Sequence, residues 1–150
     1  MLEKQITKNF NLSEFIKSDT ADKKKIDNTP TDKVIENIEE LCIKVLQPIR
    51  DYWQEPIKIS SGYRCKKLND AVGGAKNSSH LYGAAADFSA KNKKDNKKLF
   101  TLIKTLMDRN MIECHQLIWE KGTKEYPQWV HISINCDERP YRKNQILYLY

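Results

Sequence analysis

Apolar residues recur at helical spacing in two long segments of the chain. The first follows Thr29 and Pro30, which predict a helix start with Thr29 as the N-cap and Pro30 in the first helical position. We expect this helix to run to about Tyr52, with Pro48 kinking it or ending its regular part. A second amphipathic helix is predicted from Asp95 to about Arg109. The apolar stripes comprise Val34, Ile35, Ile38, Leu41, Cys42, Val45, Leu46 and Ile49 in the first helix, and Leu99, Phe100, Leu102, Ile103, Leu106 and Met107 in the second.

Shorter apolar or alternating segments predict strands. They cover residues 56–60, 84–89, 114–120, 129–134 and 145–150. Short helices are predicted over residues 12–15 and 66–72, the latter stopped by two glycines. Helices packed on one small antiparallel sheet give the α+β fold class. At 150 residues we expect one domain, 1–150, with a continuous core.

Strand alternation separates two candidate metal ligands from the core. Val130 and Ile132 form the apolar face of their strand, so His131 points to the opposite side, toward a cleft. The same alternation places Asp87 opposite the apolar Phe88.

A third candidate, His80, precedes Asp87 in the motif S-x-H-x-x-G-x-A-x-D, whose Gly83 permits a sharp turn. Histidine nitrogen and aspartate oxygen are donors that zinc accepts, and three protein ligands leave a fourth position for water or substrate. By residue type alone the signal is weak, because a histidine is more often a surface or core residue than a ligand. The hypothesis is a zinc hydrolase with ligands His80, Asp87 and His131.

Charge adds a preference for anionic partners. The net charge is +6, mostly from lysine, with clusters at residues 23–25 and 91–98. Such clusters are ordinarily solvated faces, but a basic balance also suits an anionic wall polymer. Because no arginine-rich helix or aromatic platform accompanies them, we expect no nucleic-acid partner.

The cysteines and the N-terminal residues indicate the cellular compartment in which the protein is made. Cys42, Cys65, Cys114 and Cys136 are widely spread without a C-x-x-C pair, so we expect free thiols in a reducing cytoplasm, with Cys42 buried. The first six residues lack an apolar leader segment, which predicts no signal peptide. No apolar run approaches about 18 residues, so we expect no membrane insertion.

Four motifs follow one another along the chain: S-S-G-Y-R at 60–64, L-N-D-A-V-G-G at 68–74, the motif from Ser78 to Asp87, and W-V-H at 129–131. In this order they resemble the M15 zinc peptidases. The resemblance covers roughly residues 10–135. It is to D-Ala-D-Ala carboxypeptidases and phage endolysin peptidases, and it implies a hedgehog/DD-peptidase-like fold in which His80, Asp87 and His131 hold Zn²⁺.

The resemblance also implies roles for other residues. Arg64 matches the family arginine after S-G-Y and would bind a substrate carboxylate or stabilise the oxyanion. Ser78 would hydrogen-bond near the site or fix the loop that carries His80. Tyr82 and Trp129 would line the substrate groove, with ordinary packing as the alternative for both.

The general base departs from the family pattern. The chemistry needs a carboxylate or histidine that takes a proton from the attacking water. Many family members carry an acidic residue three positions before the last histidine ligand, where this chain has Gln128. Glu120 is our candidate, because its strand should form a hairpin with the strand of His131 and because Q-L-I-x-E resembles the phage-type branch. Glu125 and His115 are lesser alternatives, and His115 is also a candidate substrate-binding or oxyanion group.

Together these features imply a zinc metallopeptidase that hydrolyses amide bonds in bacterial peptidoglycan peptides, either as an endopeptidase or as a D,D- or L,D-carboxypeptidase. We expect a monomeric phage or prophage lysis enzyme (an endolysin). It would be made in the bacterial cytoplasm without a signal peptide and act at the cell wall after release or as a virion component. Gln128 keeps open a non-catalytic wall-binding or phage structural protein on the same fold. A thiol hydrolase that pairs a cysteine with a histidine is a third possibility.

Overall fold

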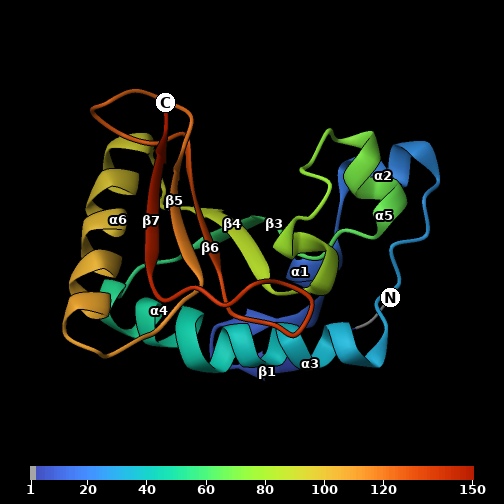
Figure 1. Ribbon diagram of the computed structural model, residues 1–150, viewed down its shortest axis with the longest axis horizontal. Coiled ribbons are helices and arrows are strands. Elements are labelled where there is room, and N and C mark those ends of the chain that lie inside the picture. The colour runs from blue at the N-terminus through green and yellow to red at the C-terminus, as the bar shows by residue number, and fades with distance from the viewer. Residues whose placement is uncertain (1–2) are drawn as a thin grey trace.

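A five-stranded sheet forms the centre of the computed structural model, which describes residues 3–150 (Figure 1). Its order is β3-β4-β6-β5-β7, with β3 at Lys58–Ser61, β4 at Ala85–Ser89, β6 at Trp129–Ser133, β5 at Gln116–Glu120 and β7 at Gln145–Leu149. The first four strands pair antiparallel, whereas β7 runs parallel to β5. The predicted α+β class is confirmed, and the sheet is mixed at its β7 edge.

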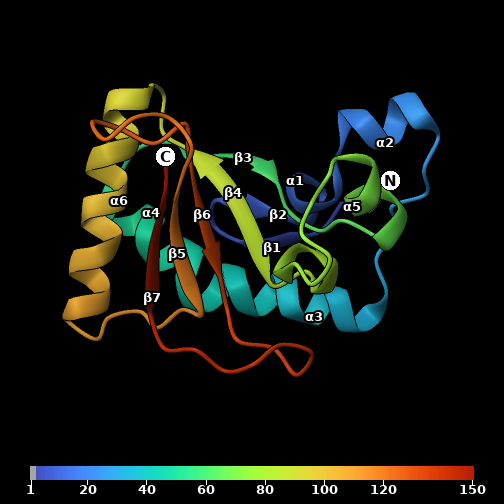
Figure 2. The same ribbon diagram turned by 45° about the horizontal axis from the view of Figure 1, so that its top comes forward.

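Helices pack against the apolar face of this sheet, and several short helices lie beyond its β3 edge (Figures 1 and 2). The helical elements are α1 (Leu12–Ile16), α2 (Asp19–Lys24), α3 (Asp32–Leu41), the π-helical turn η1 (Cys42–Leu46), α4 (Gln47–Trp53), α5 (Lys66–Ala71), the 3₁₀ turn η2 (Ser79–Tyr82) and α6 (Lys93–Asp108). A separate two-stranded sheet pairs β1 (Gln5–Thr7) with β2 (Phe10–Asn11). Within residues 3–150, no helix is both long enough and apolar enough to cross a membrane.

The first predicted helix begins later than its sequence pattern suggested. The Thr31 hydroxyl accepts a hydrogen bond from the Val34 N–H at 3.2 Å and caps α3. Thr29, the expected cap, instead donates its N–H and hydroxyl to the Asp27 carboxylate at 3.0 and 2.6 Å. This local turn holds Thr29 and Pro30 outside the helix, so the predicted N-cap and first helical position are wrong.

The helical run continues past Pro48 to Trp53. A proline within a helix lacks an N–H donor, and its ring crowds the carbonyl of the preceding turn. Here the wider π-helical turn η1 precedes Pro48, and such a turn changes the hydrogen-bond pattern where a regular α-helix would clash. The helix was expected to kink or lose its regularity at Pro48; the irregular part is instead the π-helical turn that ends at Leu46, and Pro48 lies in the first turn of α4.

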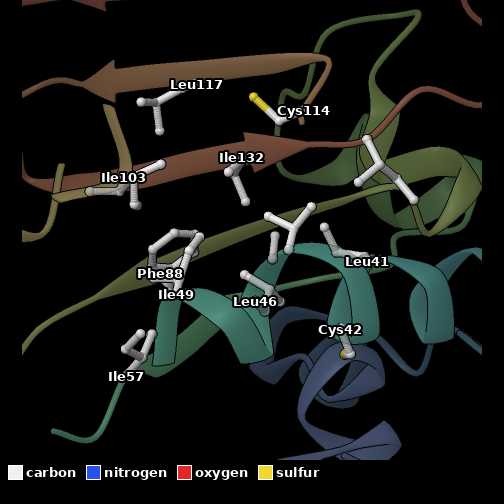
Figure 3. Close-up of a cluster of buried hydrophobic side chains, with 14 of the residues drawn as sticks. Leu41, Cys42, Leu46, Ile49, Ile57, Phe88, Ile103, Cys114, Leu117 and Ile132 are labelled. Carbon is white, nitrogen blue, oxygen red and sulfur yellow. The ribbon is translucent and has the colours of Figure 1, made fainter. Parts of the chain in front are cut away.

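The core lies between the long helical run, α6 and the sheet. Figure 3 shows Leu46 and Ile49 of the helical run facing Phe88 and Ile132 of the sheet, with Ile103 of α6 beside them. All five side chains have at most 1% relative exposure. Burying such side chains removes apolar surface from water, which is the main driving force for this packing.

All four cysteines are free thiols. Cys42 is buried as predicted, and burial raises its pKa. Burial likewise raises the pKa of Cys114 to about 12, so that thiol is protonated at neutral pH.

Asn96 ties α6 to the segment that enters β6, and its removal should destabilise the fold. Its buried amide accepts the Ala90 N–H at 2.8 Å and donates to the carbonyls of Pro127 and Gln128 at 3.3 and 3.1 Å. In Asn96→Ala these groups lose their partner, so we expect the free energy of unfolding to fall by about 2–4 kcal/mol in urea titrations. The exposed Lys97→Ala on the same helix should change it by less than about 0.5 kcal/mol. Equal midpoints for the two variants would contradict the proposed anchoring.

Candidate metal centre

The structure brings the three predicted ligand side chains together. Their ligand atoms all lie within 4.8 Å of one another. Asp87 of β4 and His131 of β6 are direct partners in the antiparallel register, and the His131 Nδ1 lies 2.8 Å from the Asp87 Oδ1. His80 comes from η2, and its Nε2 lies 3.3 Å from the same carboxylate oxygen. All three residues are buried.

Gly83 makes the turn that carries the chain from η2 into β4. Its φ of +70° lies in the left-handed region that glycine adopts readily. A Cβ at this position would lie 2.8 Å from the Val34 backbone oxygen and side chain. Both conformation and space therefore require glycine between His80 and Asp87, as the motif predicted.

A backbone carbonyl fixes the orientation of the His80 ring. The Nδ1 lies 2.6 Å from the carbonyl oxygen of Gly62. Because a carbonyl only accepts hydrogen bonds, Nδ1 carries the proton, and in the neutral ring Nε2 keeps the lone pair that a metal ion would bind. Gly62 itself is close to Phe15, since an added Cβ would lie 2.6 Å from the Phe15 Cα.

Ser78 supports the same turn. Its hydroxyl accepts a hydrogen bond from the His80 N–H at 3.1 Å and caps η2. The Arg64 N–H donates to the His80 carbonyl at 3.0 Å. The backbone of His80 is thus held from both sides, which fixes the position of its ring.

Asp87 is a buried carboxylate stabilised by two histidines. Burial alone would raise its pKa, but His80 and His131 outweigh that effect and hold the pKa of Asp87 well below its usual range. A buried anion of this kind needs a positive partner close by.

The donor set fits zinc. Two nitrogens and one oxygen are typical zinc ligands, and atoms that share a tetrahedral zinc at about 2.0–2.1 Å lie about 3.3 Å apart. The 3.3 Å between the His80 Nε2 and the Asp87 Oδ1 matches that separation. The 2.8 Å between His131 and Asp87 is shorter because the two groups hydrogen-bond directly.

A cavity of about 430 Å³ opens over the three ligands. Four of the residues singled out in the sequence line it: Arg64, Ser78, Glu120 and Trp129. Further lining residues include Gln116, Ile118, Lys121 and Arg139.

Glu120 ends β5 inside this cavity. Its strand pairs with β6 and sets Glu120 opposite Trp129, which confirms the predicted hairpin. Burial raises the pKa of Glu120; Asp87 adds to this effect, whereas His131, Lys121 and Arg64 oppose it.

Gln128 and Glu125 are exposed and do not line the cavity. The Gln128 N–H donates to the Glu120 carbonyl at 3.0 Å, so this position supports the strand end. The acidic residue in the cavity besides Asp87 is therefore Glu120.

His115 and Tyr82, both expected to contact substrate, do not line this cavity. His115 is fully buried; its Nε2 lies 3.0 Å from the Pro140 carbonyl and its Nδ1 3.1 Å from the Ser133 hydroxyl. Burial lowers the pKa of His115. Tyr82 packs against the core and donates its hydroxyl to Asn77 at 3.3 Å.

Sequence reasoning missed Arg139. It lines the cavity from the segment after β6, where its Nη1 donates to the Ser79 hydroxyl at 2.9 Å. The segment carries no recognisable motif, so only its position shortly after the last candidate ligand pointed toward the site. For His115 the sequence carried a signal of burial, because strand alternation groups it with Leu117 and Trp119, which are buried.

The cysteines lie elsewhere. None of the four is among the described residues that line the cavity. A thiol mechanism at this site therefore has no support.

Comparison with known proteins identifies the family. A family model described as Peptidase M15 matches residues 8–133. A search of curated proteins finds no match.

Asp87→Asn should abolish tight zinc binding while preserving the side-chain shape. A neutral amide replaces the only anionic ligand, so we expect zinc affinity to fall by more than about 100-fold, measured by titration calorimetry. Glu125→Gln, an exposed acid outside the cavity, is the matched control and should bind zinc as the wild type does. Unchanged zinc affinity in Asp87→Asn would rule out this ligand set.

The metal-free protein should lose stability in acid through Asp87. Because the histidines lower the pKa of Asp87 in the folded state, the carboxylate stabilises the fold above the ordinary aspartate pKa of about 3.9. That contribution is lost as the pH falls toward the folded-state pKa. We expect the urea midpoint of chelator-treated wild type to fall more steeply between about pH 5 and pH 3 than that of Asp87→Asn. Parallel curves would show that Asp87 does not contribute in this way.

Proposed function

This chain belongs to the peptidase M15 family, and from that premise we propose that it is a zinc-dependent peptidase acting on the peptides of bacterial peptidoglycan. The observation that carries the proposal is the convergence of His80, Asp87 and His131 on one cavity that also holds Glu120 and Arg64. A metal ligand set, a carboxylate outside that set and a guanidinium are the groups that metal-assisted amide hydrolysis needs.

His80, Asp87 and His131 would hold the zinc ion. A zinc ion bound there would supply Lewis-acid chemistry, polarising the scissile carbonyl and lowering the pKa of a water molecule. The Gly62 carbonyl keeps the His80 Nε2 free to bind the metal, because it fixes the proton on Nδ1.

Glu120 would be the general base. It takes a proton from the attacking water at its carboxylate and passes that proton to the leaving amine nitrogen. The burial that raises its pKa moves this carboxylate closer to the working pH, which favours proton transfer in both directions. With Glu120 in the cavity, an acidic residue at position 128 is not needed.

Arg64 would stabilise the substrate oxygen as negative charge develops on it, or bind a substrate carboxylate. Its Nη1 lies 3.5 Å from the Ser61 hydroxyl, and within residues 3–150 no carboxylate lies within 4.0 Å of its guanidinium. Burial lowers the pKa of Arg64, although Asp87 and Glu120 counteract this shift. A partly buried cation with so few protein acceptors is suited to a developing oxyanion.

Trp129 and Ser78 would contact the peptide or the loop that presents it. The Trp129 indole N–H is buried without an acceptor among the described residues, so a peptide carbonyl is a suitable partner. The Lys121 ammonium lies 5.3 Å from the Trp129 ring centroid and holds the ring at the cavity rim.

The biological setting is part of the proposal. The net charge of +6 suits the anionic polymers of a bacterial wall. We infer a monomeric phage or prophage lysis enzyme that is made in the cytoplasm and reaches the wall after release or as a virion component. Its reaction is endopeptidase or carboxypeptidase cleavage of wall peptides.

Glu120→Gln should separate metal binding from catalysis. The amide cannot accept the proton, so we expect kcat on defined wall peptides to fall by about 10²- to 10⁴-fold while zinc content is retained. Glu125→Gln should keep the wild-type rate, since that side chain is exposed outside the cavity.

The same assay tests the alternatives. If Glu120→Gln keeps both zinc and full rate, another group is the base. If zinc-loaded wild type releases no new amino groups from purified wall, the chain is a non-catalytic wall-binding protein on this fold. A rate insensitive to chelator would exclude the metal mechanism.

A further inference from the structure

Arg139 reaches the metal centre from a segment far along the chain. The segment between β6 and β7, orange-red in Figure 1, runs toward α3 and η2. Its Arg139 donates from Nη1 to the Ser79 hydroxyl at 2.9 Å and lines the cavity over the candidate ligands. Because Ser79 directly precedes His80, this hydrogen bond fixes the guanidinium next to a metal-ligand loop.

Hydrogen bonds hold the Arg139 segment in one conformation. The Asn135 side chain donates to the Arg142 carbonyl at 2.7 Å and accepts the Arg142 N–H at 2.9 Å. The fully buried His115 also donates from Nε2 to the carbonyl of Pro140 in this segment, at 3.0 Å. Arg139 is therefore pre-positioned, which lowers the entropy cost of binding a ligand.

The Arg139 guanidinium has unused donors. Arginine presents five N–H donors, and the Ser79 hydroxyl is the one hydrogen-bond acceptor found for the Arg139 side chain within residues 3–150. Its Nε is buried without an acceptor, and the same described range places no carboxylate within 4.0 Å. A fixed, partly buried cation without a counterion is complementary to an anionic ligand.

The neighbouring acids do not meet this need. Asp87 is bound to His80 and His131, and Glu120, on β5, forms no ion pair with Arg139 among residues 3–150. The Arg64 guanidinium enters from the segment after β3 and contacts Ser61. Arg64 and Arg139 thus approach the ligands from separate segments, and one acyl oxygen does not require both.

We propose that Arg139 is a specificity-determining residue that binds a carboxylate of the peptide, so that the site selects substrates carrying an acidic group near the scissile bond. The identity of the substrate rests on the proposed function, whereas carboxylate binding does not. The carboxylate is either the C-terminal group of the peptide or an acidic side chain, and both offer the bidentate partner that a guanidinium prefers. Such a contact away from the reacting atoms would position the amide for attack.

The test compares matched peptides on zinc-loaded wild type and Arg139→Gln. In the first pair, one peptide ends in a free carboxylate and its partner ends in a carboxamide. In the second pair, one peptide has glutamate beside the scissile bond and its partner has glutamine there. Loss of a charge-assisted bidentate contact should raise KM and Kd for the carboxylate member of one pair by about 10- to 100-fold and leave its amide partner unchanged. The pair that responds identifies the source of the carboxylate.

Arg109→Gln is the matched control, because this exposed arginine caps α6 outside the cavity and its replacement should change neither pair. Zinc content and the thermal midpoint establish that each variant is folded. Arg139→Lys keeps the charge but not the planar fork, so it should show an intermediate loss, and it carries the test if Arg139→Gln does not fold.

Calorimetric measurement of the binding of the same peptides distinguishes a failure of the proposed function from a failure of the Arg139 inference. If wild type hydrolyses nothing, the proposed function is wrong, but a carboxylate-selective loss of binding in Arg139→Gln still supports this inference. If Arg139→Gln affects both members of each pair equally, or neither, Arg139 does not bind the carboxylate, whatever the hydrolytic activity.

Discussion

The antiparallel pairing of β4 with β6 is the constraint on which the rest of the molecule depends. This register sets Asp87 directly across from His131 and, on the opposite face, packs Phe88 and Val130 into the core. A slip of one residue would exchange the two faces, burying the imidazole among apolar side chains and exposing core residues beside the cavity. Core packing therefore enforces the geometry of the metal centre, and the free energy that holds the sheet together also keeps the candidate ligands in place.

Much of the fold could be predicted because its longest elements have clear periodicity. The stripes of α3–α4 and α6 and the five strands of the main sheet were located from apolar spacing alone. The β1–β2 pair, α2 and η2 were missed, since segments of two to six residues contain too little periodicity to recognise. The parallel pairing of β7 with β5 could not be predicted either, because alternation determines which face a residue occupies but not which neighbour a strand chooses.

The candidate site could likewise be predicted where local sequence patterns determine it, and not where tertiary contacts do. Alternation turned His131 and Asp87 away from the core, and the expected hairpin set Glu120 beside the strand of His131; the structure has all three lining one cavity. His115 was expected beside the cleft because its strand borders it, but the structure buries this side chain together with Leu117 and Trp119. Arg139 was missed because its approach to the ligands depends on the conformation of a whole segment, held by His115 and Asn135, which no local pattern encodes.

The separation of the ligands along the chain has a consequence for biosynthesis. Asp87 and His131 are 44 positions apart, and each needs the other's strand to be held in place. A ribosome that adds about 5–20 residues per second leaves an interval of several seconds during which two ligands exist and the third does not. During that interval the nascent polypeptide has no complete centre with which to capture a cation, so metallation is deferred until the strand of His131 has been synthesised.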